Sequence, residues 1–566
     1  MDASALRSNN SSAAGVRSRK MPRDLDSMPN IEHLLQTLPS AFRGPGGTVA
    51  VVRDGKILGK HAWGMADIDR RVAMTEETLM PICSISKQMV CAVLKSLERQ
   101  PTLEMQKQGL DAGAFTAALP ALLAMDSAAH PDLAHLCNNQ SGIRDYWAMS
   151  MLWGAHPEGR FTLDEDARHA MARIGETHFA PGAQYAYSNT NFHILARLVE
   201  TVSGQTLASL LAERIFDPAG MKTALFCSTT AEHPRPCVGH EGDAQQGYVP
   251  ARNQVQWSGD AGVVASLMDM IAYEQYLHRE WTAPSSLYRQ LAERPVFNDG
   301  NPAPYGNGFA HLDIEGRKTL GHGGALRGYR LHRLHAPDEH LSIIVMLNHQ
   351  ADATALAEHL LRQVLEIGQA EATCLTADSR WTGIYLDPYS KLAISAVVGS
   401  DGTLSITYAG FAESLVFETP YRARSREMIA ELKGDRIVLY RLEDNQILHA
   451  DRLPEPAVQE STEELVGVYR CAEIDSTLLC DAAGGVLFGA FEGFLGSGPA
   501  HLMHPLGHDT WALKCPRGMD APAPGDWTLV FERDPDGSIA TVTVGCWLAR
   551  QLKYVRTHSA APPARY

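Results

Sequence analysis

The spacing of apolar residues predicts a mixed α/β arrangement at the start of the chain. Residues 31–41 have the period of a short amphipathic helix, and residues 47–63 alternate as two strands around an Asp-Gly turn. An apolar-periodic helix follows Ser84, and helical patterns continue to about Phe216. We therefore expect a hairpin followed by a large helical region.

Strand patterns return near Leu320. Residues 327–335 and 341–348 flank a short turn and predict a hairpin, and residues 353–367 predict a closing helix. Strands at both ends of a helical middle favour one antiparallel sheet with an inserted helical subdomain, an α+β fold.

Beyond about residue 375 the pattern changes to short alternating runs separated by Gly, Asp and Asn turns, which is typical of small antiparallel barrels or sandwiches. The tripeptide Gly383-Ile384-Tyr385 recurs weakly as Gly467-Val468-Tyr469, and each copy opens a strand-rich block. We predict two related β domains.

The expected organisation is an N-terminal extension without fixed structure over residues 1–30, an α+β domain over 31–374, and β domains over 375–458 and 459–566. The length of 566 residues suits about three domains at 100 to 200 residues each. Hydrophobic residues form 45% and charged residues 20% of the chain, which excludes wholesale disorder. The formal charge of -15 disfavours binding to a phosphate backbone.

The cysteine pattern and the lack of a recognisable secretory signal favour a reducing compartment. The chain has ten cysteines and no C-x-x-C pair, so reduced thiols are expected rather than a disulfide scaffold. The first thirty residues are basic but lack the apolar core of a secretory signal, and no apolar stretch approaches the ~20 residues of a membrane helix. We expect a cytoplasmic enzyme.

Ser84 and Lys87 form the motif S-x-x-K at the start of the helix that follows. Positions i and i+3 of a helix share a face, so the Lys87 amine can reach the Ser84 hydroxyl. Burial of that amine can make it a proton acceptor for a serine nucleophile. Alone, the motif is more often a helix cap beside a solvated lysine.

Two further motifs follow in order. Tyr187-Ser188-Asn189 lies in a turn-rich loop before a helix, where the tyrosine can relay a proton and the asparagine can bind Lys87 and substrate. His322-Gly323-Gly324 lies on a glycine-rich strand that allows close backbone approach to an extended substrate. Each motif also has a purely structural interpretation. The first could be a packed tyrosine beside a helix-capping asparagine, and the second could be a turn or a β-bulge.

The three motifs together resemble the S-x-x-K, Y-x-N and H-x-G boxes of penicillin-recognising serine hydrolases over about residues 45–370. A closer resemblance covers most of the chain, through segments such as 136–142, 321–328 and 545–550, and is to bacterial D-stereospecific aminopeptidases. It implies a β-lactamase-like domain, two barrels and a homodimer. It also implies that a loop of the last domain, residues 516–526, reaches the catalytic cleft.

The resemblance implies a role for each site residue. Ser84 would form an acyl-enzyme with an N-terminal D-residue, with Lys87 and Tyr187 moving protons, and Asn189 and His322 completing the catalytic set. The substrate-binding residues would be Gly324, Asp520, which pairs with the free amine, and Ala325, whose N–H joins that of Ser84 in an oxyanion hole. Arg330 lies three residues after Arg327 on the same expected strand, where it would line the pocket or pair with a carboxylate of the loop.

Other classes of site are less favoured by the sequence. His332 and His335 lie three apart on a strand and face opposite sides, no H-E-x-x-H motif accompanies them or His340, and we expect neither metal nor cofactor. The motif G-x-S-x-G is absent. The alternatives are another penicillin-recognising hydrolase, such as a β-lactamase, D,D-carboxypeptidase or esterase, and a non-catalytic binding protein on the same scaffold.

Overall fold

A computed structural model describes residues 30–123, 125, 130–368, 377–455, 462–515, 517–520 and 525–557. The expected extension over residues 1–29 lies outside the described residues, as do the domain junctions predicted at 374/375 and 458/459. Of the expected cleft loop, residues 516 and 521–524 also lie outside them.

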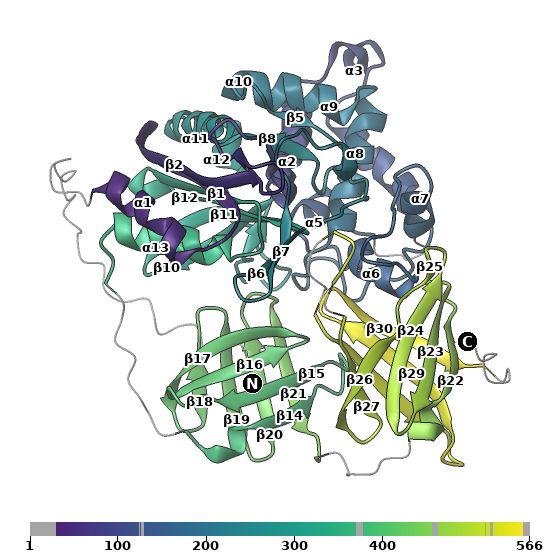
Figure 1. Ribbon diagram of the computed structural model, residues 1–566. Coiled ribbons are helices and arrows are strands. Elements are labelled where there is room, and N and C mark those ends of the chain that lie inside the picture. The colour runs from purple at the N-terminus through teal and green to yellow at the C-terminus, as the bar shows by residue number, and fades with distance from the viewer. Residues whose placement is uncertain are drawn as a thin grey trace.

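The N-terminal unit, residues 30–368, is built on one eight-stranded antiparallel sheet of order β3-β2-β1-β13-β12-β11-β10-β9 (Figure 1). The first strands of the chain therefore pair with the last strands of this unit, as the predicted fold requires. The strands are β1 Gly46–Arg53, β2 Lys56–Asp67, β3 Val72–Ala73, β9 Tyr305–Gly306, β10 Phe309–Ile314, β11 Arg317–Leu326, β12 Tyr329–Ala336 and β13 Leu341–Leu347.

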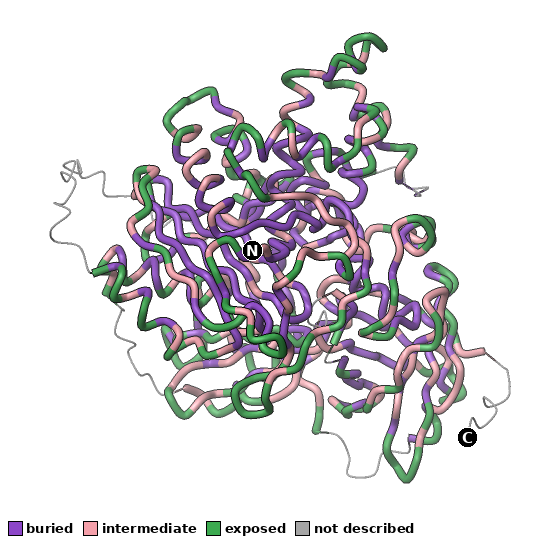
Figure 2. Tube along the Cα trace, turned by 45° about the horizontal axis from the view of Figure 1, so that its top comes forward, coloured by how far each residue is buried: buried purple, intermediate pink, exposed green. Residues whose placement is uncertain are grey.

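Helices cover both faces of this sheet because its central strands are apolar on both sides. In β1, Val49 and Val51 pack with the helices α1 (Ile31–Ala41) and α13 (Ala353–Val364), whereas Ala50 and Val52 join the core on the opposite face. Figure 2 shows the resulting band of buried strands.

The helical subdomain lies between β3 and β9 in the sequence and packs on that opposite face. Its helices are η4 Cys83–Ile85, α2 Ser86–Arg99, α3 Leu103–Lys107, α4 Gly113–Ala118, α5 Leu133–Cys137, α6 Tyr146–Leu152, α7 Asp166–Met171, α8 Asn189–Ser203, α9 Leu207–Leu211, α10 Asp217–Ala219, α11 Leu267–Thr282 and α12 Leu287–Leu291. Its short strands are β4 Met80–Pro81, β5 Leu225–Phe226 and β8 Val263–Ala265, with the hairpin β6 His240–Asp243 and β7 Gly247–Pro250.

Two closed barrels follow, as predicted. The first is β14 Gly383–Leu386, β15 Ala393–Val398, β16 Thr403–Tyr408, β17 Phe411–Thr419, β18 Arg422–Arg424, β19 Met428–Lys433, β20 Arg436–Arg441 and β21 Gln446–Arg452. The second is β22 Gly467–Cys471, β23 Ser476–Ala483, β24 Val486–Gly493, β25 Gly496–Ser497, β26 His501–Gly507, β27 Thr510–Leu513, β28 Trp527–Arg533, β29 Ile539–Cys546 and β30 Ala549–Arg556, closed by pairing of β23 with β24.

Both barrels begin with the same local construction. Tyr385 and Tyr469 are buried, and each donates its hydroxyl to a carbonyl in the short helix that precedes its strand: Tyr385 to Trp381 at 3.0 Å and Tyr469 to Leu465 at 2.8 Å. The recurring G-[I/V]-Y tripeptide therefore marks equivalent positions in the two barrels.

The second barrel packs closely on α6 and its C-terminal turn. The Trp153 indole donates to the Ile474 carbonyl at 3.0 Å, and a Cβ at Gly154, whose φ is +81°, would lie 2.0 Å from the Gly496 carbonyl oxygen. Only glycine fits this backbone-to-backbone approach.

Most element predictions are confirmed, including the helix at 31–41, the β1–β2 hairpin and the barrel strands at 403–408 and 436–441. The prediction that Arg327 and Arg330 share a strand is wrong, because Arg327 lies in the β11–β12 turn. The sequence patterns also missed α11 and the strands β5 to β10.

A buried ion pair joins α11 to β12. Arg333 binds Glu274 in bidentate geometry at 2.6 Å for each contact, both side chains are fully buried, and Ser342 adds a hydrogen bond to Glu274 at 2.7 Å. We expect Glu274→Gln to lower the free energy of unfolding by about 3–5 kcal/mol, because it leaves a guanidinium without its counter-charge.

Urea unfolding followed by circular dichroism tests this expectation. Lys107→Gln is the control, because it breaks an exposed pair with Glu104 in the same unit and should cost less than about 1 kcal/mol. Equal losses in the two variants would contradict the assigned role of the buried pair.

Candidate functional site

Ser84 lies in the one-turn helix η4, directly before α2, and faces strand β11. The residue before it, Cys83, has a φ of +52°, which is rare for a side chain of this kind. A Cβ at Gly324 would lie 2.4 Å from the Ile82 carbonyl oxygen. The glycine therefore lets β11 press against the turn that presents Ser84.

Lys87 is completely buried and donates to three acceptors. Its Nζ lies 2.9 Å from Ser84 Oγ and 2.8 Å from Asn189 Oδ1, and it also donates to the carbonyl of Asp260. The predicted Ser84–Lys87 and Lys87–Asn189 contacts are thus present, and they join η4, α2 and α8.

Burial lowers the pKa of Lys87 to about 8, although the nearby carboxylates of Asp260, Asp145 and Asp520 oppose this shift. A neutral amine keeps two protons and one lone pair. Asn189 Oδ1 and the Asp260 carbonyl can only accept, so they take the two protons. The lone pair is then left for the Ser84 hydroxyl, which is the geometry of a general base.

Asp145 fixes the orientation of the Asn189 amide. It accepts from Asn189 Nδ2 at 2.8 Å and from the Asn189 backbone N–H at 2.6 Å, and it caps α6 through the Ala148 N–H at 2.9 Å. Because a carboxylate only accepts, the amide must turn its oxygen toward Lys87.

Tyr187 lies on the other side of Lys87, with the amine 5.0 Å from the centre of its ring. Burial raises the pKa of Tyr187 well above its usual value, while a hydrogen bond with Ser84 acts in the opposite direction. The phenol therefore holds its proton at neutral pH and lies beside the serine hydroxyl.

His322 is neutral. Burial lowers its pKa to about 3, its Nδ1 lies 2.6 Å from the Gly323 carbonyl, and its Nε2 lies 2.9 Å from the Tyr305 hydroxyl. Nδ1 must carry the ring proton, since a carbonyl cannot donate, so Tyr305 donates to Nε2. Both nitrogens are engaged, and the ring contributes shape rather than charge.

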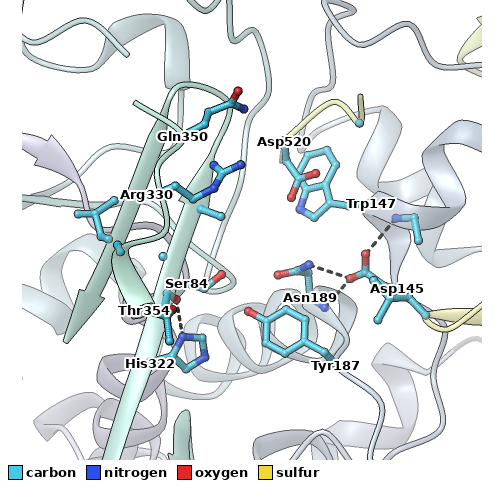
Figure 3. A pocket seen from close by; sticks show the side chains of 18 of the residues that line it. Ser84, Asp145, Trp147, Tyr187, Asn189, His322, Arg330, Gln350, Thr354 and Asp520 are labelled. Atoms are coloured by element: carbon cyan, nitrogen blue, oxygen red, sulfur yellow. Dashed lines mark hydrogen bonds between the residues drawn. The ribbon is translucent and has the colours of Figure 1, made fainter. Parts of the chain in front are cut away.

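A cavity of about 490 Å³ lies between the N-terminal unit and the second barrel, and Ser84, Tyr187, Asn189 and His322 line it (Figure 3). Gly324, Ala325 and Arg330 line it from β11 and β12, and Asp520 reaches it from the loop of the second barrel. Arg330 donates to the carbonyls of Leu326 and Tyr329 at 2.9 and 2.7 Å. The structure thus brings all nine predicted site residues to one place.

A shared carboxylate holds the loop over this cavity. Glu241 on β6 accepts from Arg327 at 2.9 Å and from Arg517 at 2.7 Å, and each arginine makes a second, longer contact with it. The Arg327 backbone N–H also donates to the Asp520 carbonyl at 2.8 Å. The loop that carries Asp520 is therefore tied to the β11–β12 turn.

Sequence reasoning missed Asp145, Asp260 and Tyr305. The Asp260 carboxylate accepts from the Tyr146 hydroxyl at 2.8 Å and the Trp147 indole at 3.0 Å, which fixes the loop whose carbonyl binds Lys87. The sequence could have indicated Asp145 as a helix N-cap, because it follows the Ser141-Gly142 turn and directly precedes Tyr146 and Trp147. Asp260 and Tyr305 had none.

Other kinds of site are not indicated within the described ranges. No group of three or more His, Cys, Asp or Glu side chains there could hold a metal ion. The nine cysteines among the described residues are unpaired. No described helix is long and apolar enough to cross a membrane.

Family models and curated relatives match this chain over most of its length. Residues 31–366 match the family model described as beta-lactamase, and residues 374–555 match that described as D-aminopeptidase, domain B. The D-aminopeptidase of Brucella melitensis biotype 1 is 44% identical over 529 residues, covering 94% of this chain and 99% of the relative. That of Brucella anthropi is 44% identical over 526 residues, covering 93% and 98%.

Among solved structures, the D-amino acid amidase from Ochrobactrum anthropi SV3 complexed with D-phenylalanine aligns at 18% identity and a TM-score of 0.48. The alignment covers 60% of this chain and 97% of that chain.

The pKa of Lys87 predicts how Ser84 responds to pH. The rate at which a neutral fluorophosphonate modifies Ser84 should rise up to about tenfold per pH unit below 8 and level off above it, because only the neutral amine takes the serine proton. Intact-protein mass spectrometry measures this rate. Lys87→Met should abolish labelling, whereas Lys95→Met, on the same helix, should leave the profile unchanged. A flat profile between pH 6 and 9 would exclude Lys87 as the base.

Proposed function

The chain belongs to the D-aminopeptidase family, and we propose from its site that it is a serine aminopeptidase that releases N-terminal D-residues from short peptides, amides and esters. The observation that supports this most strongly is one cavity that holds both the Ser84–Lys87–Asn189 contacts and the carboxylate of Asp520. The first group can attack a carbonyl, and the second can bind an ammonium group.

Acylation begins when the neutral Lys87 amine takes the proton of Ser84. The Ser84 oxygen then attacks the carbonyl carbon of the N-terminal residue, and backbone N–H groups of Ser84 and Ala325 stabilise the oxyanion. Collapse of this intermediate breaks the bond to the leaving amine, which takes a proton from Tyr187 or Lys87. The protonated phenol of Tyr187 suits it to this donation.

Deacylation reverses the proton path. Water loses a proton to Lys87 or Tyr187 as it attacks the D-aminoacyl ester, and Ser84 regains its proton when the ester breaks. The uncharged His322 ring lines the cavity and positions Tyr305 and the strand of Gly324. Arg330 borders the substrate from β12.

Asp520 is the best candidate for binding the free amine because the other carboxylates that line the cavity are occupied. Asp145 accepts three hydrogen bonds, and Asp352 caps α13 through the backbone N–H groups of Thr354 and Ala355. Burial and the charge of Asp145 raise the pKa of Asp520 to about 7. A substrate ammonium would relieve this cost with a charge-assisted hydrogen bond.

The homodimer and the cytoplasmic location that we expect from the sequence stay predictions. They bear on where the enzyme works and do not change the chemistry derived from the site.

The stereochemical and free-amine requirements can be tested with four substrates. D-alanine p-nitroanilide should be cleaved at least about 100-fold faster, in kcat/KM, than the L compound or the N-acetylated forms of either, because only the first satisfies both Asp520 and the acylation geometry. Ser84→Ala should be inert. Cleavage of L or acetylated compounds as fast as the free D compound would favour a different penicillin-recognising hydrolase.

Asp520→Asn should separate amine binding from folding. We expect kcat/KM for the free D-alanine compound to fall about 10- to 100-fold, the value of a charge-assisted hydrogen bond, with little change for the N-acetylated compound. Asp526→Asn is the matched control, because it removes a partly exposed carboxylate near the same loop whose partner is Lys514. An equal fall in kcat/KM on both substrates, or a lowered Tm, would mean that Asp520 only stabilises the loop and does not bind the amine.

A further inference from the structure

A second cavity, of about 560 Å³, lies between β10 of the N-terminal unit and the outer surface of the first barrel. It shares no lining residue with the cavity of Ser84. Its size and its place between two domains are those of ordinary small-molecule sites.

One wall of this cavity is a row of side chains across four strands. Arg424, Ile429, Tyr440 and Ile447 are register partners in turn from β18 to β21, and all four line the cavity. The row spans about 14 Å at the usual strand spacing. Ile447 is 45% exposed and Tyr440 is half-buried, whereas Ile429 is buried, so the exposed apolar surface of the row lies at Tyr440 and Ile447.

Two ionisable side chains on this wall, an arginine and a glutamic acid, have no partner among the described residues. Arg424, at one end of the row, has no hydrogen bond or ion pair with any described residue, whereas Arg422 and Arg441 are paired with carboxylates. Glu443, in the turn between β20 and β21, also has no hydrogen bond or ion pair within the described chain. Burial and the charges of Asp444 and Glu427 raise the pKa of Glu443 to about 8, and Arg441 opposes them.

The walls of the cavity are held in place by hydrogen bonds between the two units. Asn445 donates to Asp299 and to the Ala183 carbonyl, each at 3.0 Å, and Asn301 donates to Asn445 at 3.0 Å. His311 lines the far side of the cavity, and its buried Nε2 has no hydrogen-bond partner among the described residues. The cavity is therefore a fixed feature of the domain interface.

We propose that this cavity binds a short zwitterionic peptide of two or three residues. Its ammonium group pairs with Glu443, its carboxylate pairs with Arg424, and its apolar side chains lie on Ile429, Tyr440 and Ile447. An extended tripeptide is roughly 10–11 Å long at about 3.3–3.6 Å per residue, which fits within the row of about 14 Å. A simple anion would leave Glu443 without a partner and cover none of the apolar row.

The test is calorimetric titration of L-leucyl-L-leucyl-L-leucine into the full-length Ser84→Ala protein, which cannot consume it. Binding should weaken at least tenfold on adding Glu443→Gln or Arg424→Gln. It should stay unchanged on adding Arg436→Gln, which removes an exposed arginine of the same barrel that pairs with Asp451 and does not line the cavity.

Peptides blocked at one end test whether the ammonium group binds Glu443 and the carboxylate binds Arg424. N-acetylation should weaken binding to the Ser84→Ala protein but cause no further loss with Glu443→Gln, and C-terminal amidation should behave in the same way with Arg424→Gln. No binding, binding insensitive to both substitutions, or equal competition by inorganic phosphate would overturn the proposal. On the Ser84-intact background, Glu443→Gln should leave cleavage of D-alanine p-nitroanilide unchanged, so this result is independent of the proposed function.

Discussion

The site depends on one buried amine. Lys87 is held by acceptors from three parts of the chain, η4, α8 and the loop of Asp260, in a place where water does not reach it. Burial disfavours the charged form of the amine and lowers its pKa, while the nearby carboxylates partly oppose this shift. The net pKa of about 8 lets the amine lose its proton near neutral pH. Removing any one acceptor would change both where Lys87 points and how readily it ionises.

The barrels complete this arrangement from outside the N-terminal unit. The Leu548 carbonyl of the second barrel accepts from the Asp145 backbone N–H at 3.2 Å, next to the carboxylate that orients Asn189. The same barrel supplies Asp520, and Glu241 ties its loop to β11 through Arg327 and Arg517. In the function that we propose, this carboxylate is the group that selects a free amine on a scaffold otherwise suited to attacking many carbonyls.

The sequence predicted what depends on short spacing, and failed where contacts come from distant segments. The i, i+3 relation placed Lys87 beside Ser84, and alternation placed the barrel strands. No local pattern links Asp260 to Lys87, which are 173 residues apart. His322 was predicted as a catalytic group from its motif, and that role stays a prediction. Its hydrogen bond with Tyr305 depends on the packing of β9 on β10, which no local pattern indicates.

The most direct test of this account is a crystal structure of the Ser84→Ala enzyme with a D-alanyl peptide bound. The account predicts that the peptide's ammonium nitrogen lies about 3 Å from an Asp520 carboxylate oxygen. It also predicts that the first carbonyl oxygen lies between the backbone N–H groups of residue 84 and Ala325. An ammonium group placed away from Asp520, or a carbonyl turned away from those N–H groups, would contradict it.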